Sequence, residues 1–241
     1  MKVELIQYNA DAADIMIFTK QTRLNMVPGL LDEIKAWPNE KKLKELEYMA
    51  NTIPSSWEFS DYTFLITGVS RAFTHQFVRT RQGSYAQQSM RVTDQSGFDY
   101  ITGPTIGGDD ESSLSGTVYH QLMSLIKEAY GILIEAGVSI EDARGILPTN
   151  ICTNIVAKFN LRTLSELARS RTGGRTQSEY RDVVQAMCDE VLKVHPWAHM
   201  FLFPKGRDYF TELERIALRV KIFNYDLGQD MLKIIDKMRK E

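Results

Sequence analysis

The stretch from residue 61 to residue 83 constrains the fold most, because it runs from a strand directly into a helix. Residues 61–68 read DYTFLITG, and this density of β-branched and aromatic side chains predicts a strand. Ser70 is a preferred helix N-cap residue, and Gly83 breaks the helical pattern that follows it. On that predicted helix Phe73 and Phe77 share one face, whereas Arg71, His75 and Arg79 share another. The chain must therefore combine a sheet with helices.

The remaining pattern predicts an α+β fold. A strand is expected over residues 1–8, then helices over 11–23 and 29–49, the second interrupted at Trp37-Pro38. Residues 97–115 are rich in glycine and acids and predict an exposed loop. Beyond the loop the pattern is helical over 114–137, 139–148, 149–171, 177–194 and 208–240, and Ser139 is expected to cap the second of these helices. We expect an N-terminal strand-helix sheet part packed with a mostly helical C-terminal part, as a single domain over residues 1–241.

Composition excludes several classes of protein. The chain has 241 residues, 43% of them hydrophobic, and a net charge of -2, which argues against a nucleic-acid binder. No apolar run approaches the ~20 residues needed to span a membrane. The two cysteines form no CxxC motif, which predicts the reducing cytoplasm, or the host cytoplasm if a virus encodes the chain. Pro196 separates His195 from His199, so no metal site is expected.

A first arginine group lies within residues 79–91, which read RTRQGSYAQQSMR. It belongs to a run without acids from Tyr62 to Thr93, which creates a local positive field on a nearly neutral protein. Such a field suits a small anion with several charges. A solvated helix face is the alternative, but the interleaved Gln and Ser residues are directional donors and acceptors and favour a binding site.

A second arginine group lies within residues 160–175, which read NLRTLSELARSRTGGR. Arg171 falls on the same helical side as Leu164 and Leu167, where a guanidinium is costly unless it faces a ligand or pairs with a core acid. Arg162 and Glu166 are spaced for an i,i+4 ion pair. Arg144 is spaced for an i,i+3 salt bridge with Glu141, and Cys152 and Cys188 fit small buried apolar residues better than nucleophiles.

The spacing of these groups resembles the flavin-dependent thymidylate synthases. That family has Arg-His-Arg, seven residues, Ser, and Arg at the second position beyond; here the pattern is Arg79-Thr80-Arg81, Ser89 and Arg91. A second block agrees, with Glu141-Asp-Ala-Arg144-Gly-Ile-Leu-Pro148, Asn160-x-Arg162, Arg171 and Gln177-x-Glu179. The resemblance covers roughly residues 57–197.

The resemblance implies reductive methylation of dUMP to dTMP by a homotetramer whose sites combine several subunits. Methylenetetrahydrofolate would donate the carbon, and FAD, reduced by NADPH, would supply the hydride. The implied catalytic residue is Arg171. The implied dUMP residues are Gln76, Arg79, Gln87, Gln88, Ser89, Met90, Arg91, Arg144 and Arg171. The implied FAD residues are Ser55, Glu58, Arg79, Thr80, Arg81, Gln82, Gln87, Asn160, Arg162 and Glu166.

Individual roles follow from charge. Arg79, Arg91 and Arg144 can give a phosphate charge-assisted hydrogen bonds, and Arg171 can favour the N3-ionised, electron-rich uracil. If the helix that starts at Ser70 persists to Gln82, Arg79 and Arg81 diverge and can serve nucleotide and flavin separately.

The sequence also departs from the family pattern. Thr80 replaces the usual His, Ile53-Pro-Ser-Ser replaces an upstream His and Thr-Pro, Glu166 replaces a neutral amide, and Arg175 replaces a His. These changes leave open a pyrimidine deoxynucleotide hydroxymethylase on the same scaffold, or a member without activity. A nucleic-acid-binding protein that stacks bases on Tyr85 and Phe77 is a further alternative.

Overall fold

The computed structural model describes residues 1–106, 113–173, 176–203, 213, 216–218, 220–221 and 223–240. The chain divides into two compact units, Met1–Phe203 and Pro204–Glu241, and each is described by itself. The single domain over residues 1–241 stays a prediction. No helix of the described residues is long and apolar enough to cross a membrane.

The first unit is built on a four-stranded antiparallel sheet with the order β1-β2-β4-β3. The strands are β1 (Lys2–Tyr8), β2 (Asp61–Ser70), β3 (Ser84–Gln87) and β4 (Cys152–Asn160). In the two central strands Asp61 lies opposite Asn160 and Ser70 lies opposite Cys152. The predicted strands at the N-terminus and at 61–68 are thereby confirmed, and β3 begins directly after Gly83.

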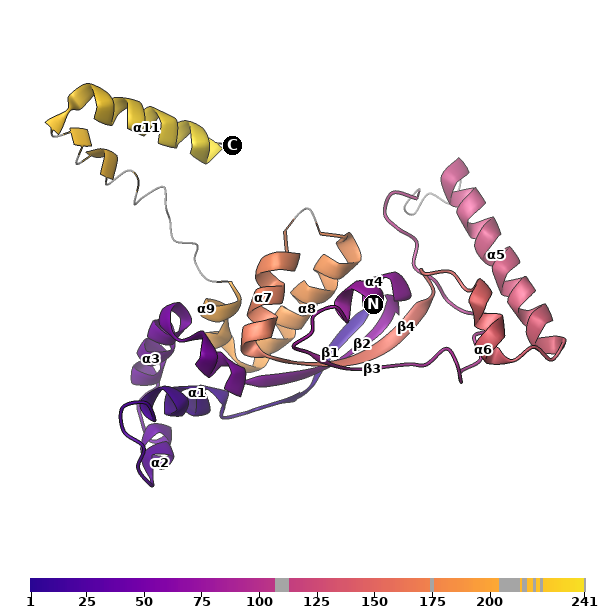
Figure 1. The fold of residues 1–241 in the computed structure, drawn as a ribbon, viewed down its shortest axis with the longest axis horizontal. Coiled ribbons are helices and arrows are strands. Elements are labelled where there is room, and N and C mark those ends of the chain that lie inside the picture. The colour runs from indigo at the N-terminus through magenta and orange to yellow at the C-terminus, as the bar shows by residue number, and fades with distance from the viewer. Residues whose placement is uncertain are drawn as a thin grey trace. The chain divides into compact units, whose positions relative to one another are not determined.

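Helices complete the α+β architecture, and α4, α7 and α8 lie over one face of the sheet (Figure 1). The α-helices are α1 (Ala12–Gln21), α2 (Leu30–Lys35), α3 (Asn39–Thr52), α4 (Arg71–Phe77), α5 (Leu114–Glu135), α6 (Ile140–Ala143), α7 (Leu161–Arg171), α8 (Ser178–Val194), α9 (His199–Leu202) and α11 (Tyr225–Lys240). Short 3-10 turns are η1 (Pro54–Phe59), η2 (Arg144–Ile146) and η3 (Pro196–Ala198). The predicted break at Trp37-Pro38 separates α2 from α3.

The predicted helix over residues 149–171 is wrong in its first half, because β4 occupies Cys152–Asn160 and α7 begins only at Leu161. Thr153, Ile155, Ala157 and Phe159 are buried and alternate with more exposed residues, which is the period of a strand. Two neighbours, β2 and β3, hydrogen-bond to this strand from both sides. Sheet pairing therefore outweighs the local helical pattern, and Cys152 lies on a strand.

The α4 helix is shorter than the spacing of Arg71, His75 and Arg79 predicts. Ser70 caps it, since the Ser70 side chain accepts a hydrogen bond from Phe73 N at 3.0 Å, as predicted. The helix ends at Phe77, so Arg79 lies beyond it and does not share a helical face with Arg71 and His75. The condition for Arg79 and Arg81 to diverge on a helix is therefore not met.

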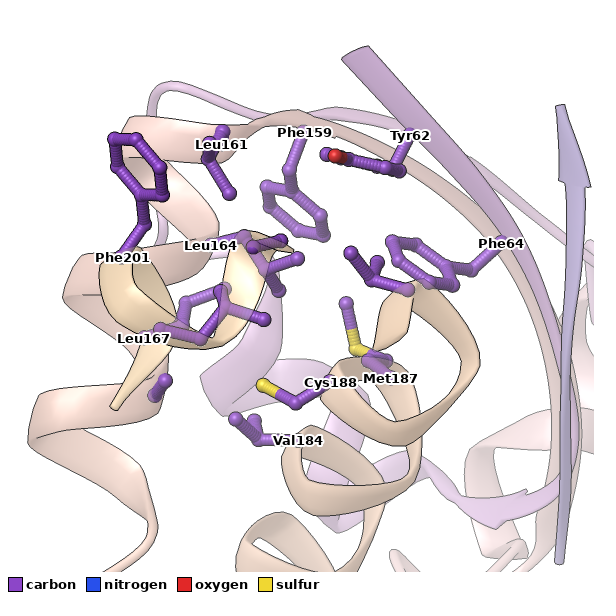
Figure 2. Packing of buried hydrophobic residues seen from close by; sticks show 14 of the residues in the cluster. Tyr62, Phe64, Phe159, Leu161, Leu164, Leu167, Val184, Met187, Cys188 and Phe201 are labelled. Carbon is purple, nitrogen blue, oxygen red and sulfur yellow. The ribbon is translucent and has the colours of Figure 1, made fainter. Parts of the chain in front are cut away.

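The core lies between the sheet and the helices α7, α8 and α9 (Figure 2). Tyr62 and Phe64 of β2 and Phe159 of β4 face residues from these helices, which include Leu161, Leu164, Leu167, Val184, Met187, Cys188 and Phe201. These side chains are at most 4% exposed. Because both central strands and α7 bury their apolar faces in this one core, it fixes the helix that carries the second arginine group.

In the second unit the described part of the predicted helix over 208–240 includes α11, where Ile235 is buried. Residues 208–212, 214–215, 219 and 222 of that prediction, like residues 107–112 of the predicted loop, lie outside the described residues.

Gly83 provides a test of the packing beside β3. A Cβ added there would overlap Phe159 Cε1 and lie 2.8 Å from the Tyr85 hydroxyl. We expect Gly83→Ala to lower the free energy of unfolding by about 1–3 kcal/mol in urea denaturation. The matched Gly131→Ala has open space in the interior of α5 and should raise it by about 0.5–1 kcal/mol. Equal effects of the two substitutions would contradict the described packing.

His195 predicts a pH dependence of stability. It is 4% exposed, its Nδ1 lies 2.9 Å from the Tyr62 hydroxyl, and burial lowers its pKa from the ordinary 6.5. Because the folded state then binds fewer protons than the unfolded state, this contribution is present above pH 6.5 and is lost as pH falls below it. In urea denaturation, the free energy of unfolding of the wild type should be lower at about pH 5.5 than at about pH 7.5. His195→Asn should reduce this difference, whereas the exposed His199→Asn should leave it unchanged.

Candidate active site

Two half-buried arginines line a hollow of about 220 Å³ beside the start of α4. They are Arg71 and Arg144, and His75 and Met90 lie with them. The rest of the lining is Gly145, Leu147, Pro148, Thr149 and Ile151. No carboxylate belongs to this lining, so its charged groups are all cationic.

Hydrogen bonds to backbone carbonyl oxygens hold the Arg71 main chain and the Arg144 side chain. Arg71 N donates to Ile151 O at 3.0 Å, and Ala72 N donates to Thr149 O at 2.7 Å, which anchors α4 to the opposite wall of the hollow. Arg144 follows α6, whose N-terminus is capped by Ser139 as predicted. The Arg144 Nε donates to Glu141 O at 3.1 Å. The predicted i,i+3 salt bridge is therefore wrong, because the Glu141 carboxylate instead pairs with Arg91 Nε at 2.8 Å.

The positive charge of Arg71 is disfavoured in this hollow. Burial and, next, the nearby Arg144 charge lower the pKa of Arg71. Within the described residues, no ion pair joins Arg71 or Arg144 to a carboxylate. The hollow therefore combines two like charges that no carboxylate of the described residues neutralises.

Other predicted nucleotide residues lie in α4, at the end of β3 and directly after it. Gln87 Nε2 donates to Thr74 Oγ1 at 2.9 Å, and Gln88 Oε1 accepts from Asn154 Nδ2 at 3.1 Å. The Ser89 hydroxyl accepts from Arg91 N at 3.3 Å. Gln76, at the end of α4, donates through Nε2 to Gln177 Oε1 at 2.8 Å.

A second hollow, of about 170 Å³, joins the two arginine motifs. Thr80, the centre of the Arg-Thr-Arg turn, and Arg171, the last residue of α7, both line it. Thr163, Glu166, Leu167 and Ser170 complete the lining. Arg171 is exposed, with its guanidinium carbon 5.0 Å from the Tyr180 ring centroid. It thus leaves the apolar side of α7 at the helix end, and no core acid among the described residues pairs with it.

The predicted flavin residues gather around the start of α7. Arg162 Nη1 lies 2.7 Å from Glu58 Oε1, and Arg162 Nε lies 3.4 Å from Glu166 Oε1, which confirms the predicted i,i+4 pair. Asn160 caps α7 by accepting from Thr163 N at 2.9 Å. The other contacts in this group are Arg23 Nη2 to Ser55 Oγ at 2.7 Å and Thr163 Oγ1 to Gln82 Oε1 at 3.2 Å.

Arg79 and Arg81 are exposed on the turn after α4, and neither pairs with a carboxylate of the described residues. The turn itself is held by the Tyr85 hydroxyl, which donates to Phe77 O at 3.0 Å and to Thr80 O at 2.8 Å. Both guanidiniums are therefore available to an anion. Arg175 of the second block lies outside the described residues.

A larger hollow, of about 560 Å³, is lined by described residues that include none of these arginines. Its lining includes Ser70, Gln177 and Glu179. Glu179 binds the start of α4, since its carboxylate accepts from Ser70 N and from Ser70 Oγ, both at 2.6 Å. Gln177 and Glu179 thus hold α4 at both ends.

The thiols are poor nucleophiles. Burial raises the pKa of Cys188 to about 12 and also raises the pKa of Cys152 above its ordinary value. The described residues contain no group of three His, Cys, Asp or Glu side chains arranged for a metal ion.

Sequence reasoning did not assign Arg71, His75 or Thr163 to a site. For Arg71 and His75 the signal was present, because both lie in the acid-free run at a helical spacing of four. No sequence pattern indicated Thr163, because it lines the hollow only when the fold brings α7 close to Thr80.

Comparisons with known proteins agree with these motifs. The family model described as "Thymidylate synthase complementing protein" matches residues 4–197. A flavin-dependent thymidylate synthase of Clostridium tetani is 31% identical over 214 residues, which is 81% of this chain and 84% of that protein. One of Sulfurisphaera tokodaii is 32% identical over 215 residues, 85% of this chain and 78% of that protein.

Among solved structures, the fold is similar to thymidylate synthase X of Helicobacter pylori, crystallised with FAD and dUMP. The TM-score is 0.64 at 20% identity, over 85% of this chain and 97% of that one. The matched length and the identities define the class of protein. The chain belongs to the flavin-dependent thymidylate synthases.

The Ser70–Glu179 contact can be tested by a double-mutant cycle. Ser70→Ala and Glu179→Ala should each lower the free energy of unfolding by about 1–3 kcal/mol, since each leaves a polar group of the pair unsatisfied. The double variant should lose less than the sum, by about 0.5–3 kcal/mol, when unfolding is measured in urea. Strict additivity would show that the two side chains do not interact.

Proposed function

We propose that this chain catalyses the reductive methylation of dUMP to dTMP, with methylenetetrahydrofolate as the carbon donor. One observation carries the proposal: Thr80 of the first motif and Arg171 of the second line the same hollow. Two motifs that are far apart in sequence thus contribute to one site in a chain of this family.

The nucleotide would bind through Arg79 and Arg91 of the first arginine group and through Arg144. These guanidiniums provide charge-assisted donors for the phosphate, which is a stronger and more directional contact than neutral donors give. The other proposed nucleotide residues, which supply amides, a hydroxyl and backbone groups, are Gln76, Gln87, Gln88, Ser89 and Met90.

Arg171 would act on the uracil ring. A guanidinium that donates to the pyrimidine edge stabilises the N3-ionised form and makes C5 more nucleophilic. The raised thiol pKa values of Cys152 and Cys188 support a route in which no cysteine adds to the ring. Arg171 fits this role because it is exposed, lines the hollow and has no ion pair to a carboxylate of the described residues.

The flavin would be held by the turn after α4 and the start of α7. The side chains there suit a polar, partly anionic heterocycle, because they combine guanidiniums, amides and hydroxyls. The proposed residues are Ser55, Glu58, Arg79, Thr80, Arg81, Gln82, Gln87, Asn160, Arg162 and Glu166. When bound, reduced FAD supplies the hydride, and NADPH restores it. Glu58 and Glu166 orient Arg162, while Tyr85 holds the Thr80 backbone.

A homotetramer with sites that combine several subunits, and a cytoplasmic location, are further proposals that follow from the family. The two free cysteines support a reducing compartment.

The product of turnover tests the proposal. Purified protein with FAD, NADPH, methylenetetrahydrofolate and dUMP should add one methyl group to the nucleotide, read by mass spectrometry. Arg171→Ala should lower kcat by about 100-fold or more, because it removes a donor that stabilises developing charge. Arg169→Ala is the matched control on the same helix, since Arg169 is outside both hollows.

A hydroxymethyl product would contradict the methylation and indicate the alternative reaction. Full activity of Arg171→Ala would remove Arg171 from the mechanism. Equal losses in Arg171→Ala and Arg169→Ala would mean that the effect comes from α7 as a whole and not from the uracil contact.

A further inference from the structure

The helix α11 of the second unit carries apolar residues on two sides, one buried and one exposed. On the buried side Gly228 is covered and Ile235 is 5% exposed. On the other side Leu227, Ile234 and Met238 are each at least 52% exposed. An apolar stripe on a helix is expected to face another apolar surface, so the exposed side requires a partner.

The exposed side has the spacing of a seam between paired helices. Leu227, Met231, Ile234 and Met238 follow one another at intervals of four, three and four residues. These intervals give the d, a, d and a positions of a heptad repeat, which is the pattern with which one helix packs along another. The four residues are named the α11 seam.

Charged residues flank the α11 seam in a pattern that distinguishes the two possible directions of pairing. Asp230 and Lys237 occupy the g positions, whereas Gly228 and Ile235 of the buried side occupy the e positions. In an antiparallel pair the g positions of the two helices meet, which brings Asp230 to the partner's Lys237. In a parallel pair each g position meets an e position, which here carries no charge. The charges therefore match an antiparallel second copy of the same helix.

We propose that the α11 seam binds the α11 seam of a second copy of this chain, with the two helices antiparallel. The apolar residues of the seam supply the association, because they leave water on both helices. The Asp230–Lys237 pairs between the two copies set the direction more than the affinity, since exposed ion pairs contribute little.

This contact does not depend on the proposed function. The helix α11 lies beyond residues 4–197, which the family model matches. The residues of the α11 seam also line neither of the two hollows that join the arginine motifs. The contact is therefore a property of the second unit, whichever reaction the first unit catalyses.

Disulfide trapping tests both the pairing and its direction. Full-length Asp230→Cys/Lys237→Cys, oxidised with copper–phenanthroline, should run mostly as a linked dimer on a non-reducing gel. Residues seven apart on one helix are separated by about 10 Å, too far for a disulfide within the chain. Each single variant should therefore remain unlinked, as the wild type with Cys152 and Cys188 should. An equal mixture of the two single variants should form the linked dimer again.

The matched control is Gln229→Cys/Asp236→Cys, which places two cysteines at the same spacing on the opposite side of α11. It should remain unlinked under the same oxidation. Ile234→Asp, added to Asp230→Cys/Lys237→Cys, should abolish the linked dimer, because it puts a charge into the apolar seam.

Equal cross-linking of the seam variant and the control variant would overturn the proposal, and so would a linked dimer that survives Ile234→Asp. A seam variant that stays unlinked would overturn it as well. In that case co-sedimentation with vesicles of phosphatidylcholine and phosphatidylserine identifies the occupant: binding of the wild type but not of Ile234→Asp would assign the seam to a lipid surface.

Discussion

The antiparallel pairing of β2 with β4 is the interaction on which the rest of the structure depends. At one end of this ladder Ser70 lies opposite Cys152, so α4 begins beside the segment that carries Thr149 and Ile151. At the other end Asp61 lies opposite Asn160, where the Asn160 cap starts α7. From there α7 runs for 11 residues, about 16 Å, to place Arg171 in a hollow with Thr80. One ladder therefore positions both arginine groups.

Charge is distributed differently around Arg162 and in the hollow beside the start of α4. Around Arg162, two carboxylates occupy the guanidinium and fix its orientation. In the hollow lined by Arg71 and Arg144, no carboxylate of the described residues belongs to the lining or forms an ion pair with either guanidinium. The replacement of the family histidine by Thr80 leaves the backbone of the turn held by Tyr85. The substitution therefore changes one side chain of the second hollow without removing the support of its neighbouring arginines.

The sequence was sufficient for features encoded within a few residues. The Ser70 and Ser139 caps, the break at Trp37-Pro38 and the Arg162–Glu166 pair are local, and the structure confirms each. It was insufficient where contacts between distant segments determine the structure. The local pattern of β4 predicts a helix, because the two strands that pair with β4 are far away in sequence. Likewise, Glu141 binds Arg91 although Arg144 has the regular spacing for an ion pair with it. The two hollows could not be predicted, since each combines residues from elements that only the fold brings together.

A crystal structure of the protein with FAD and dUMP tests the central claim most directly, because it locates the phosphate and the flavin in one experiment. The account predicts phosphate oxygens within hydrogen-bonding distance of the Arg79, Arg91 and Arg144 guanidiniums, with the uracil edge at Arg171. It also predicts the flavin beside the turn at Thr80 and the start of α7. A phosphate bound away from these three arginines, or a flavin remote from Arg162, would contradict the account.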